Sequence, residues 1–146
     1  YYATTQGEIV TLPVLTAMPT LTPTSTLTPV VDFSVSFRED DICSGKYYIE
    51  FKVENTGNII YQSVWVSVTN NDDSETVDAS YDKFEEWDAC AINQTYSDLD
   101  PGDVGYTRSA DLTNDPNGKS FSAKVKVCSG PGLAGTCREK GFGFTP

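Results

Sequence analysis

Four cysteines are the residues best suited to covalent chemistry in this chain of 146 residues, which contains no histidine. An even number of cysteines predicts disulfides and an oxidising compartment. A structural zinc site usually draws on closely spaced ligand pairs, and the chain has neither a Cys-x-x-Cys pair nor a histidine. Four cysteines allow three pairings. The short loop that contains Gly and Pro favours Cys128–Cys137, which leaves Cys43–Cys90 as the second pair.

Acidic residues are plentiful, but their arrangement does not predict catalysis. The absence of histidine removes the commonest general base and any Ser-His or Cys-His nucleophile. The carboxylates cluster at residues 39–41, 72–73 and 85–86, where turn formers and solvated caps are expected. Residues 130–135 are rich in glycine, but they contain a proline and lie between two cysteines, so they predict a hairpin loop instead of a phosphate-binding loop. We therefore expect no enzymatic activity and no cofactor.

Two groups of oxygen-bearing side chains lie in predicted loops and have the chemistry of calcium ligands. Neither group matches the twelve-residue calcium-binding loop, and turn formation accounts for both. We therefore expect no metal site. The two groups are Asp111, Asn114, Asp115 and Asn117, and Asp98, Asp100 and Asp103.

The net charge argues against two classes of partner. Lys and Arg number 10 against 21 Asp and Glu, which gives a formal charge of −11. Such a chain repels phosphate backbones and anionic lipid surfaces, so we expect no nucleic-acid partner. No apolar stretch approaches the roughly 20 residues that a membrane span needs. The beginning of the chain has no signal-peptide pattern, so it is interpreted as a mature or trimmed product. The predicted disulfides favour a location that is extracellular or on the cell surface.

The first 18 residues form an arm that differs in composition from the rest of the chain. Apolar residues recur there at every second position, which predicts a β-strand without a local partner. Pro13 lacks an N–H group and suits an edge or an inserted strand. The apolar positions are Val10, Leu12, Val14 and Met18.

Residues 19–30 form a Thr/Pro-rich linker between the arm and the remaining domain, residues 31–146. Proline favours an extended path, so at about 3.1 Å per residue the linker is a semi-rigid spacer of roughly 30 Å. A dense row of Thr and Ser is typical of an O-glycosylated stalk, and an undecorated tether is the alternative. Asn93 fits the N-glycosylation pattern. The candidate glycosylation sites are Thr20, Thr22, Thr24, Ser25, Thr26, Thr28 and Asn93.

Alternating apolar and polar residues from position 31 onward indicate an all-β domain. Residues 76–84 are interpreted as a short edge strand, and residues 85–90 as a helical turn or an irregular crossing. Short strands between turn signals, with no convincing helix, predict an antiparallel immunoglobulin-like β-sandwich of about seven strands. The other predicted strands are residues 33–37, 47–53, 60–68, 104–112, 121–127 and 137–144.

Aromatic residues suggest a second candidate surface. Trp65 and Tyr61 fall on the face opposite Val64, and Tyr47 and Tyr48 add aromatic area. Exposed aromatic side chains on a flat face stack on sugar rings or on a neighbouring subunit. If another layer of structure covers that face, the same side chains belong to the core.

The turns at residues 53–58 and 99–103 resemble those of bacterial and archaeal immunoglobulin-like domains of the cell-adhesion-related, CARDB-like kind. Such domains carry a strand that ends in an Asn-x-Gly turn and a later Leu-x-Pro-Gly turn that leads into a strand. The resemblance covers roughly residues 31–144 and implies the fold and a surface location. The chain departs from that pattern in residues 76–98 and in its four cysteines.

The succession of arm, spacer and sandwich resembles the subunits of extracellular fibres that assemble by donating an N-terminal strand. The resemblance implies that the apolar residues of the arm enter a sheet edge of the next copy, so the partner is the protein itself. Because residues 31–144 already supply six or seven strands, the donated strand would be added at an edge or in a groove. The alternative hypothesis is a stalk-tethered adhesion or carbohydrate-binding module that uses Trp65.

Overall fold

The computed structural model of the chain describes Gly7 and residues 26–146, and these residues form nine β-strands and one short 3₁₀ helix. The sequence predicted about seven strands, and the structure has two more between residues 84 and 96. The elements are β1 (Ser34–Cys43), β2 (Lys46–Glu54), β3 (Ser63–Asn70), β4 (Thr76–Tyr81), β5 (Phe84–Asp88), β6 (Ala91–Tyr96), β7 (Val104–Arg108), β8 (Phe121–Gly130), η1 (Pro131–Leu133) and β9 (Ala134–Phe144).

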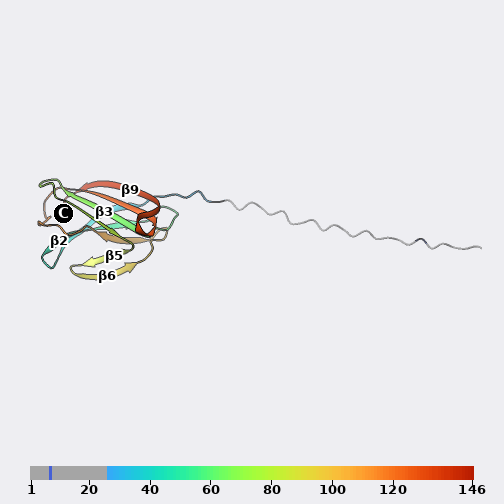
Figure 1. Cartoon of the computed structure of the whole chain (residues 1–146), viewed down its shortest axis with the longest axis horizontal. Helices are drawn as coiled ribbons and strands as arrows, with labels where there is room; N and C mark the ends of the chain where they lie inside the picture. Colours follow the sequence, from blue (N-terminus) through green and yellow to red (C-terminus); the bar gives the residue numbers. More distant parts are fainter. Residues whose placement is uncertain (1–6, 8–25) are drawn as a thin grey trace, which may run out of the picture.

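Two larger sheets organise the described part of the chain. One has the strand order β1-β2-β7 and the other β4-β3-β8-β9, and every pairing between neighbours is antiparallel. They lie face to face around a shared core, as in a β-sandwich (Figure 1). The prediction of an all-β protein with antiparallel sheets is therefore confirmed. The edge position predicted for residues 76–84 is also correct, because β4 lies at the end of its sheet.

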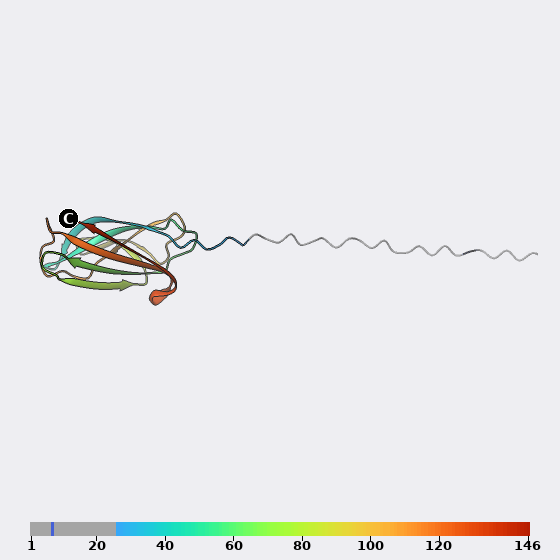
Figure 2. The same cartoon turned by 90° about the horizontal axis from the view of Figure 1, so that it is seen from above.

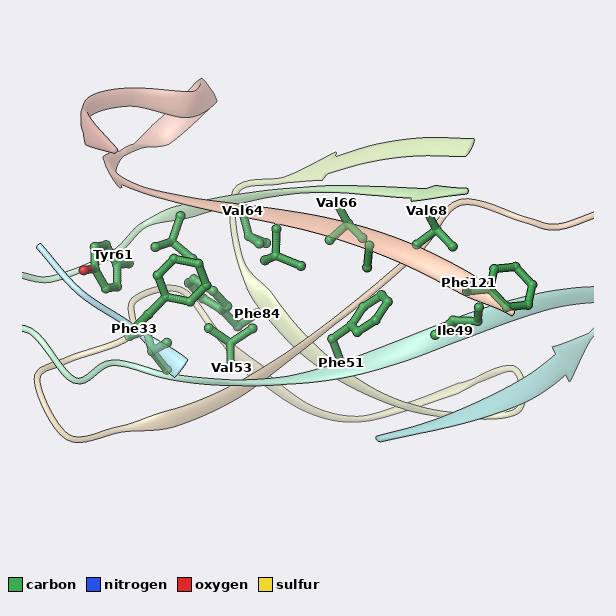
Figure 3. Packing of buried hydrophobic residues seen from close by; sticks show 14 of the residues in the cluster. Phe33, Ile49, Phe51, Val53, Tyr61, Val64, Val66, Val68, Phe84 and Phe121 are labelled. Atoms are coloured by element: carbon green, nitrogen blue, oxygen red, sulfur yellow. The ribbon is translucent and has the colours of Figure 1, made fainter. Parts of the chain in front are cut away.

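The core follows from the two-residue period of the strands. Val64, Val66 and Val68 point from β3 toward Phe51 and Val53 of β2 (Figure 3), and all five are fully buried. Side chains at alternate strand positions share one face, so each strand contributes a row of apolar groups to the interior. Burial of each such side chain contributes roughly 1.5–3 kcal/mol.

A two-stranded hairpin, β5–β6, adds a third layer to the sandwich. It lies on the side of the molecule away from β9 (Figure 1) and contacts the outer face of β2, where it covers Tyr48 and Glu50. The interpretation of residues 85–90 as a helical turn or irregular crossing is therefore wrong. Glu85 and Glu86 belong to a strand that pairs with β6, and their carboxylates contact Lys83 and Arg38.

Both expected disulfides are present. Cys43–Cys90 ties the end of β1 to the turn of the β5–β6 hairpin, and Cys128–Cys137 joins directly opposed positions of β8 and β9. Closing a loop restricts the unfolded chain, and the chain-entropy estimate for bridges of this kind is about 2–4 kcal/mol. The first disulfide therefore holds the third layer against the sandwich.

Two disulfides are compatible with an extracellular location, since such bonds persist in oxidising compartments. Within the part of the chain that the structure describes, no helix is long and apolar enough to cross a membrane. The Gly- and Pro-containing loop between Cys128 and Cys137 contains η1 and connects two paired strands, as expected for a hairpin loop.

The described chain enters the sandwich at one pole and ends at the other (Figures 1 and 2). The entry pole, here called the arm pole, is formed by the turn at residues 55–58. At the far pole, Phe144 of β9 pairs with Phe121 of β8, and the Gly118 N–H donates to the carbonyl of Pro146. Strands β1 and β9 therefore both run from the arm pole to the far pole.

Candidate functional site

Residues 26–30, the end of the linker, are here called the arm root. The arm root is held at the arm pole by the turn that follows β2. The Val30 N–H donates to Oδ1 of Asn58 at 2.6 Å, and Nδ2 of Asn58 donates to the carbonyl of Thr28 at 3.1 Å. The backbone N–H of Asn58 donates to the carbonyl of Val30 at 3.0 Å. One asparagine thus binds the incoming chain at both Thr28 and Val30 and holds this segment against the arm pole.

Two further contacts hold the segment just beyond this root. The carboxylate of Asp32 forms an ion pair with Nζ of Lys140 at 2.8 Å, and the hydroxyl of Tyr61 donates to the carbonyl of Asp32 at 2.9 Å. The Lys140 ion pair and the Phe33 N–H lower the pKa of Asp32. Because Lys140 lies on β9, the root of the arm is joined to both sheets of the sandwich.

The close approach of the arm to the turn requires glycine at position 57. A Cβ at Gly57 would lie 2.3 Å from the carbonyl oxygen of Val30 and 2.9 Å from the backbone nitrogen of Asp32. We expect Gly57→Ala to lower the free energy of unfolding by about 1–3 kcal/mol, because backbone must move to relieve the overlap. Urea titration measures this loss. Gly141→Ala is the control, since its nearest atom is an ordinary 3.4 Å away, and equal stability of the two variants would contradict the argument.

Most of the residues predicted to donate a strand or carry sugars lie outside the described residues, and those that are described are accessible. Val10, Leu12, Val14, Met18, Thr20, Thr22, Thr24 and Ser25 are in the first group. Thr26 and Thr28 are exposed at the root of the arm, and Asn93 is exposed on β6. These three positions are therefore open to glycosylation.

The sandwich presents a free sheet edge at β9, beside β1. Among the described residues, β9 has one hydrogen-bonded neighbour, β8, and β1 has one, β2. Side chains alone close the seam between them: Phe37 of β1 stacks on Phe144 of β9 with ring centroids 5.1 Å apart. Phe37, Phe142 and Phe144 are only partly buried, so apolar area remains accessible along this seam.

A buried ion network lies between β2 and the β5–β6 hairpin. The guanidinium of Arg38 contacts Glu50 through Nη1 and Glu86 through Nη2, each at 2.5 Å. Glu50 is fully buried, and its other oxygen accepts the Trp87 N–H at 2.7 Å. The Arg38 guanidinium also lies 4.5 Å from the ring centroid of Tyr106. Arg38 is therefore the shared cation of two carboxylates from different layers.

Burial changes the acidity of this network. Loss of solvation raises the pKa of Glu50 to about 7, although the Trp87 N–H and Arg38 both act to lower it. Burial also raises the pKa of the neighbouring Tyr48 to about 12. The Tyr48 hydroxyl donates to the carbonyl of Ala89 at 2.8 Å, next to the disulfide at Cys90. The network and the disulfide together attach the hairpin to the sandwich.

The aromatic surface expected from the sequence is only partly formed. Tyr61 is fully buried because it belongs to the hydrophobic core, and Tyr48 is nearly so because the hairpin covers it. Trp65 remains on the outer face of the four-stranded sheet, partly buried, with Nζ of Lys126 5.1 Å from the ring centroid. A sugar-binding face would therefore depend on Trp65 and not on a group of aromatic residues.

Several of the loop residues considered as calcium ligands accept hydrogen bonds from the protein itself. Asp115 accepts the Asn117 N–H, Asp98 accepts from the side chain of Gln62, and the Asp100 carbonyl accepts the Asp103 N–H. In the described part of the chain, no group of three or more His, Cys, Asp or Glu residues is arranged to hold a metal ion.

Comparisons with protein-family models, with curated proteins and with solved structures found no match to this chain. The function is therefore inferred from the sequence and the geometry of this chain.

Sequence reasoning missed the Arg38 network and correctly placed the disulfides. Alternation along β2 predicts that Tyr48 and Glu50 face water, and they do lie on the face opposite Ile49 and Phe51. The hairpin that covers them comes from residues almost 40 positions later, and Glu86 reaches Arg38 across 48 positions. The one available signal was the charged, aromatic composition of residues 84–88, which suits a strand lying on a polar sheet face.

Proposed function

We propose that this chain is a non-enzymatic structural subunit of an extracellular filament, which polymerises when residues 8–18 add to a sheet edge of a neighbouring copy. The observation that carries the proposal is the arrangement of the ends: the arm root is fixed at one pole, and β9 ends at the other. A contact between two different surfaces on identical subunits, repeated without closing a ring, produces an open filament.

The exposed arm root supports this use of the arm. Residues 26–30 are all exposed and belong to none of the strands, while Asn58 holds their end in a fixed direction. A fixed root reduces the conformational freedom that is lost when the arm binds a neighbour, and preorganisation of this kind raises affinity. The spacer of roughly 30 Å then separates the sandwich from its donated strand.

We also infer an immunoglobulin-like arrangement of the sandwich. The strand orders β1-β2-β7 and β4-β3-β8-β9 support it, because sheets of this kind hold strands A, B and E on one side and C, F and G on the other. The resemblance to CARDB-like surface domains stays a prediction. Glycans on the spacer and on Asn93 are part of the same proposal, since a filament exposed to the environment gains protection from them.

Removal of residues 1–18 tests the proposed function. We expect the full-length protein to sediment as long polymers and the truncated protein to sediment as a monomer. The sandwich should keep its far-ultraviolet circular dichroism, because its hydrophobic core and both disulfides are formed by residues from Phe33 onward. A full-length protein that stays monomeric at high concentration, or a truncated protein that polymerises equally well, would overturn the proposal.

A stalk-tethered adhesion or carbohydrate-binding module is the second candidate. Trp65 favours it, because the indole lies on an outward sheet face beside the small residues Ser67 and Ser80, with Lys126 as its partner on β8. Aromatic rings in such a position stack on sugars. The truncation test separates the two candidates, since a tethered module does not need residues 1–18 in order to bind its ligand.

A further inference from the structure

The acceptor of the donated strand can be inferred from the free edges of the sandwich. We propose that residues 8–14 of one copy add in parallel to the free edge of β9 in the next copy, over the seam between β9 and β1. This inference rests on the proposed function and names the partner surface that the function requires.

Strand length, regular pairing and charge favour β9 over the other edge strands. β9 has 11 residues, whereas β4 and β6 have 6 each and β7 has 5. β1 is long enough, but its ladder shifts register between Phe37 and Glu39, and residues 39–41 are acidic. Bulges and charges of this kind protect an edge against added strands. The β8–β9 ladder also shifts register, between Cys128 and Gly130, but it is continuous from Cys137 to Phe144. This continuous stretch is longer than β4, β6 or β7 and longer than either part of β1.

The outer face of β9 is open where a second strand would approach. Positions 141 and 143 lie on the outer face of the sheet, because Lys124 and Ser122, the β8 residues opposite Gly141 and Gly143, are exposed. A Cβ built at either glycine meets no atom closer than 3.4 Å. On the inner side, Phe142 and Phe144 are partly exposed beside Phe37. An added strand would cover these aromatic side chains with its own inward-facing residues.

The charges of the arm and of the strands β8 and β9 favour this acceptor and one register of the added strand. Of the ten Lys and Arg residues of the chain, four lie on β8 and β9, which contain a single acidic residue, Glu139. Glu8 is the one charged residue among the first 31. A register that places Glu8 beside Arg138 also places Leu12 beside Phe142 and Val14 beside Phe144. In that register Pro13, which has no N–H group, lies beside Gly143.

The direction of the added strand relative to β9 follows from the positions of the arm pole and the far pole. In a head-to-tail stack, the arm pole of one copy faces the far pole of the next, and the arm enters at the end of β9. Its distal residues then lie toward the arm pole of the acceptor, so residues 8–14 run in the same direction as β9. The spacer of roughly 30 Å covers the distance back to the donor's own root.

Disulfide trapping tests this register. Chains with Thr11→Cys are mixed with chains with Gly141→Cys, allowed to assemble and then oxidised; peptide mass mapping identifies the new bond and verifies the native pairs. Positions 11 and 141 are outward-facing neighbours in the proposed register, at a spacing that a disulfide bridges. We expect a heterodimer that is resistant to denaturant without reductant. The matched control replaces Gly141→Cys with Ser80→Cys, an exposed position on the opposite edge strand, β4.

The outcomes distinguish the inference from the proposed function. A heterodimer with Gly141→Cys and none with Ser80→Cys supports the β9 acceptor. Polymers that trap Ser80→Cys, or that trap neither position, overturn the β9 acceptor and leave strand donation standing at another edge. Failure of the parent protein to polymerise at all overturns the proposed function itself.

Discussion

Replacing both Leu12 and Val14 with aspartate is expected to abolish polymerisation and leave the sandwich folded. The proposed interface places these two side chains on the partly exposed rings of Phe142 and Phe144. An ionised carboxylate buried without a partner costs several kcal/mol, and each 1.4 kcal/mol is a tenfold change in an association constant. Two such charges in every interface therefore lower the association constant by several orders of magnitude. Sedimentation velocity should show monomers at concentrations at which the parent chain forms long polymers.

The matched control places the same two charges on the other side of the arm. Thr11→Asp with Ala17→Asp changes the net charge equally, but position 11 faces solvent in the proposed register and position 17 lies beyond residues 8–14. We expect this double variant to polymerise nearly as well as the parent. Unaltered polymerisation of the Leu12 and Val14 variant would show that the apolar side of the arm does not enter a neighbour. Loss of polymerisation in both variants would assign the effect to net charge.

Arg38→Ala is expected to lower the free energy of unfolding more than any other single substitution of a partly exposed side chain in the sandwich. The change leaves the fully buried Glu50 and its neighbour Glu86 without their shared cation. Removing one partner of a buried ion pair typically costs about 3–5 kcal/mol, a large part of the stability of an ordinary domain. Urea unfolding measures the loss. Arg138→Ala, at an exposed arginine of β9, should change stability by no more than about 0.5 kcal/mol.

The pH dependence of the stability lost in Arg38→Ala distinguishes an electrostatic cause from a loss of packing. The pKa of Glu50 is about 7 in the folded protein, above its ordinary value of 4.5. Its contribution to stability is therefore fully present below pH 4.5 and is lost as the pH rises through about 7, because the unfolded chain releases the proton first. Arg38→Ala should thus cost more at pH 8 than at pH 5. In a Glu50→Gln background the same change should cost much less, and an equal cost in both backgrounds would contradict the charge argument.

Much of the sandwich was predictable from the sequence because its strands alternate cleanly. Val64, Val66 and Val68 share one face of β3, and all three are in the core. The disulfide Cys128–Cys137 followed from the short loop between its cysteines, and Cys43–Cys90 followed by elimination. Each of these features depends on local spacing or on a count, which a single sequence supplies.

The third layer was not predictable, because its determinants are not local. Glu50 occupies a position that alternation assigns to solvent, and its burial depends on Arg38, Glu86 and Trp87 from other strands. Tyr61 was likewise assigned to an exposed face, but it belongs to the hydrophobic core, and its hydroxyl donates to the carbonyl of Asp32. Periodicity shows which residues share a face, but it does not show which faces another segment covers.

The junction between the arm root and the sandwich was only partly predictable from the sequence. The Asn-x-Gly turn at residues 55–58 was recognised as a turn, but its second role was not. Asn58 binds the incoming chain through Thr28 and Val30, and Gly57 leaves room for that chain. The turn at the arm pole therefore also holds residues 28–30 against the sandwich.

Cryo-electron microscopy of the purified full-length protein tests the central claim most directly. We expect filaments in which residues 8–14 of each subunit form an additional strand along β9 of the next, with the sandwiches stacked arm pole to far pole. Dispersed single sandwiches, or filaments in which the arm contacts no neighbouring sheet, would contradict the account.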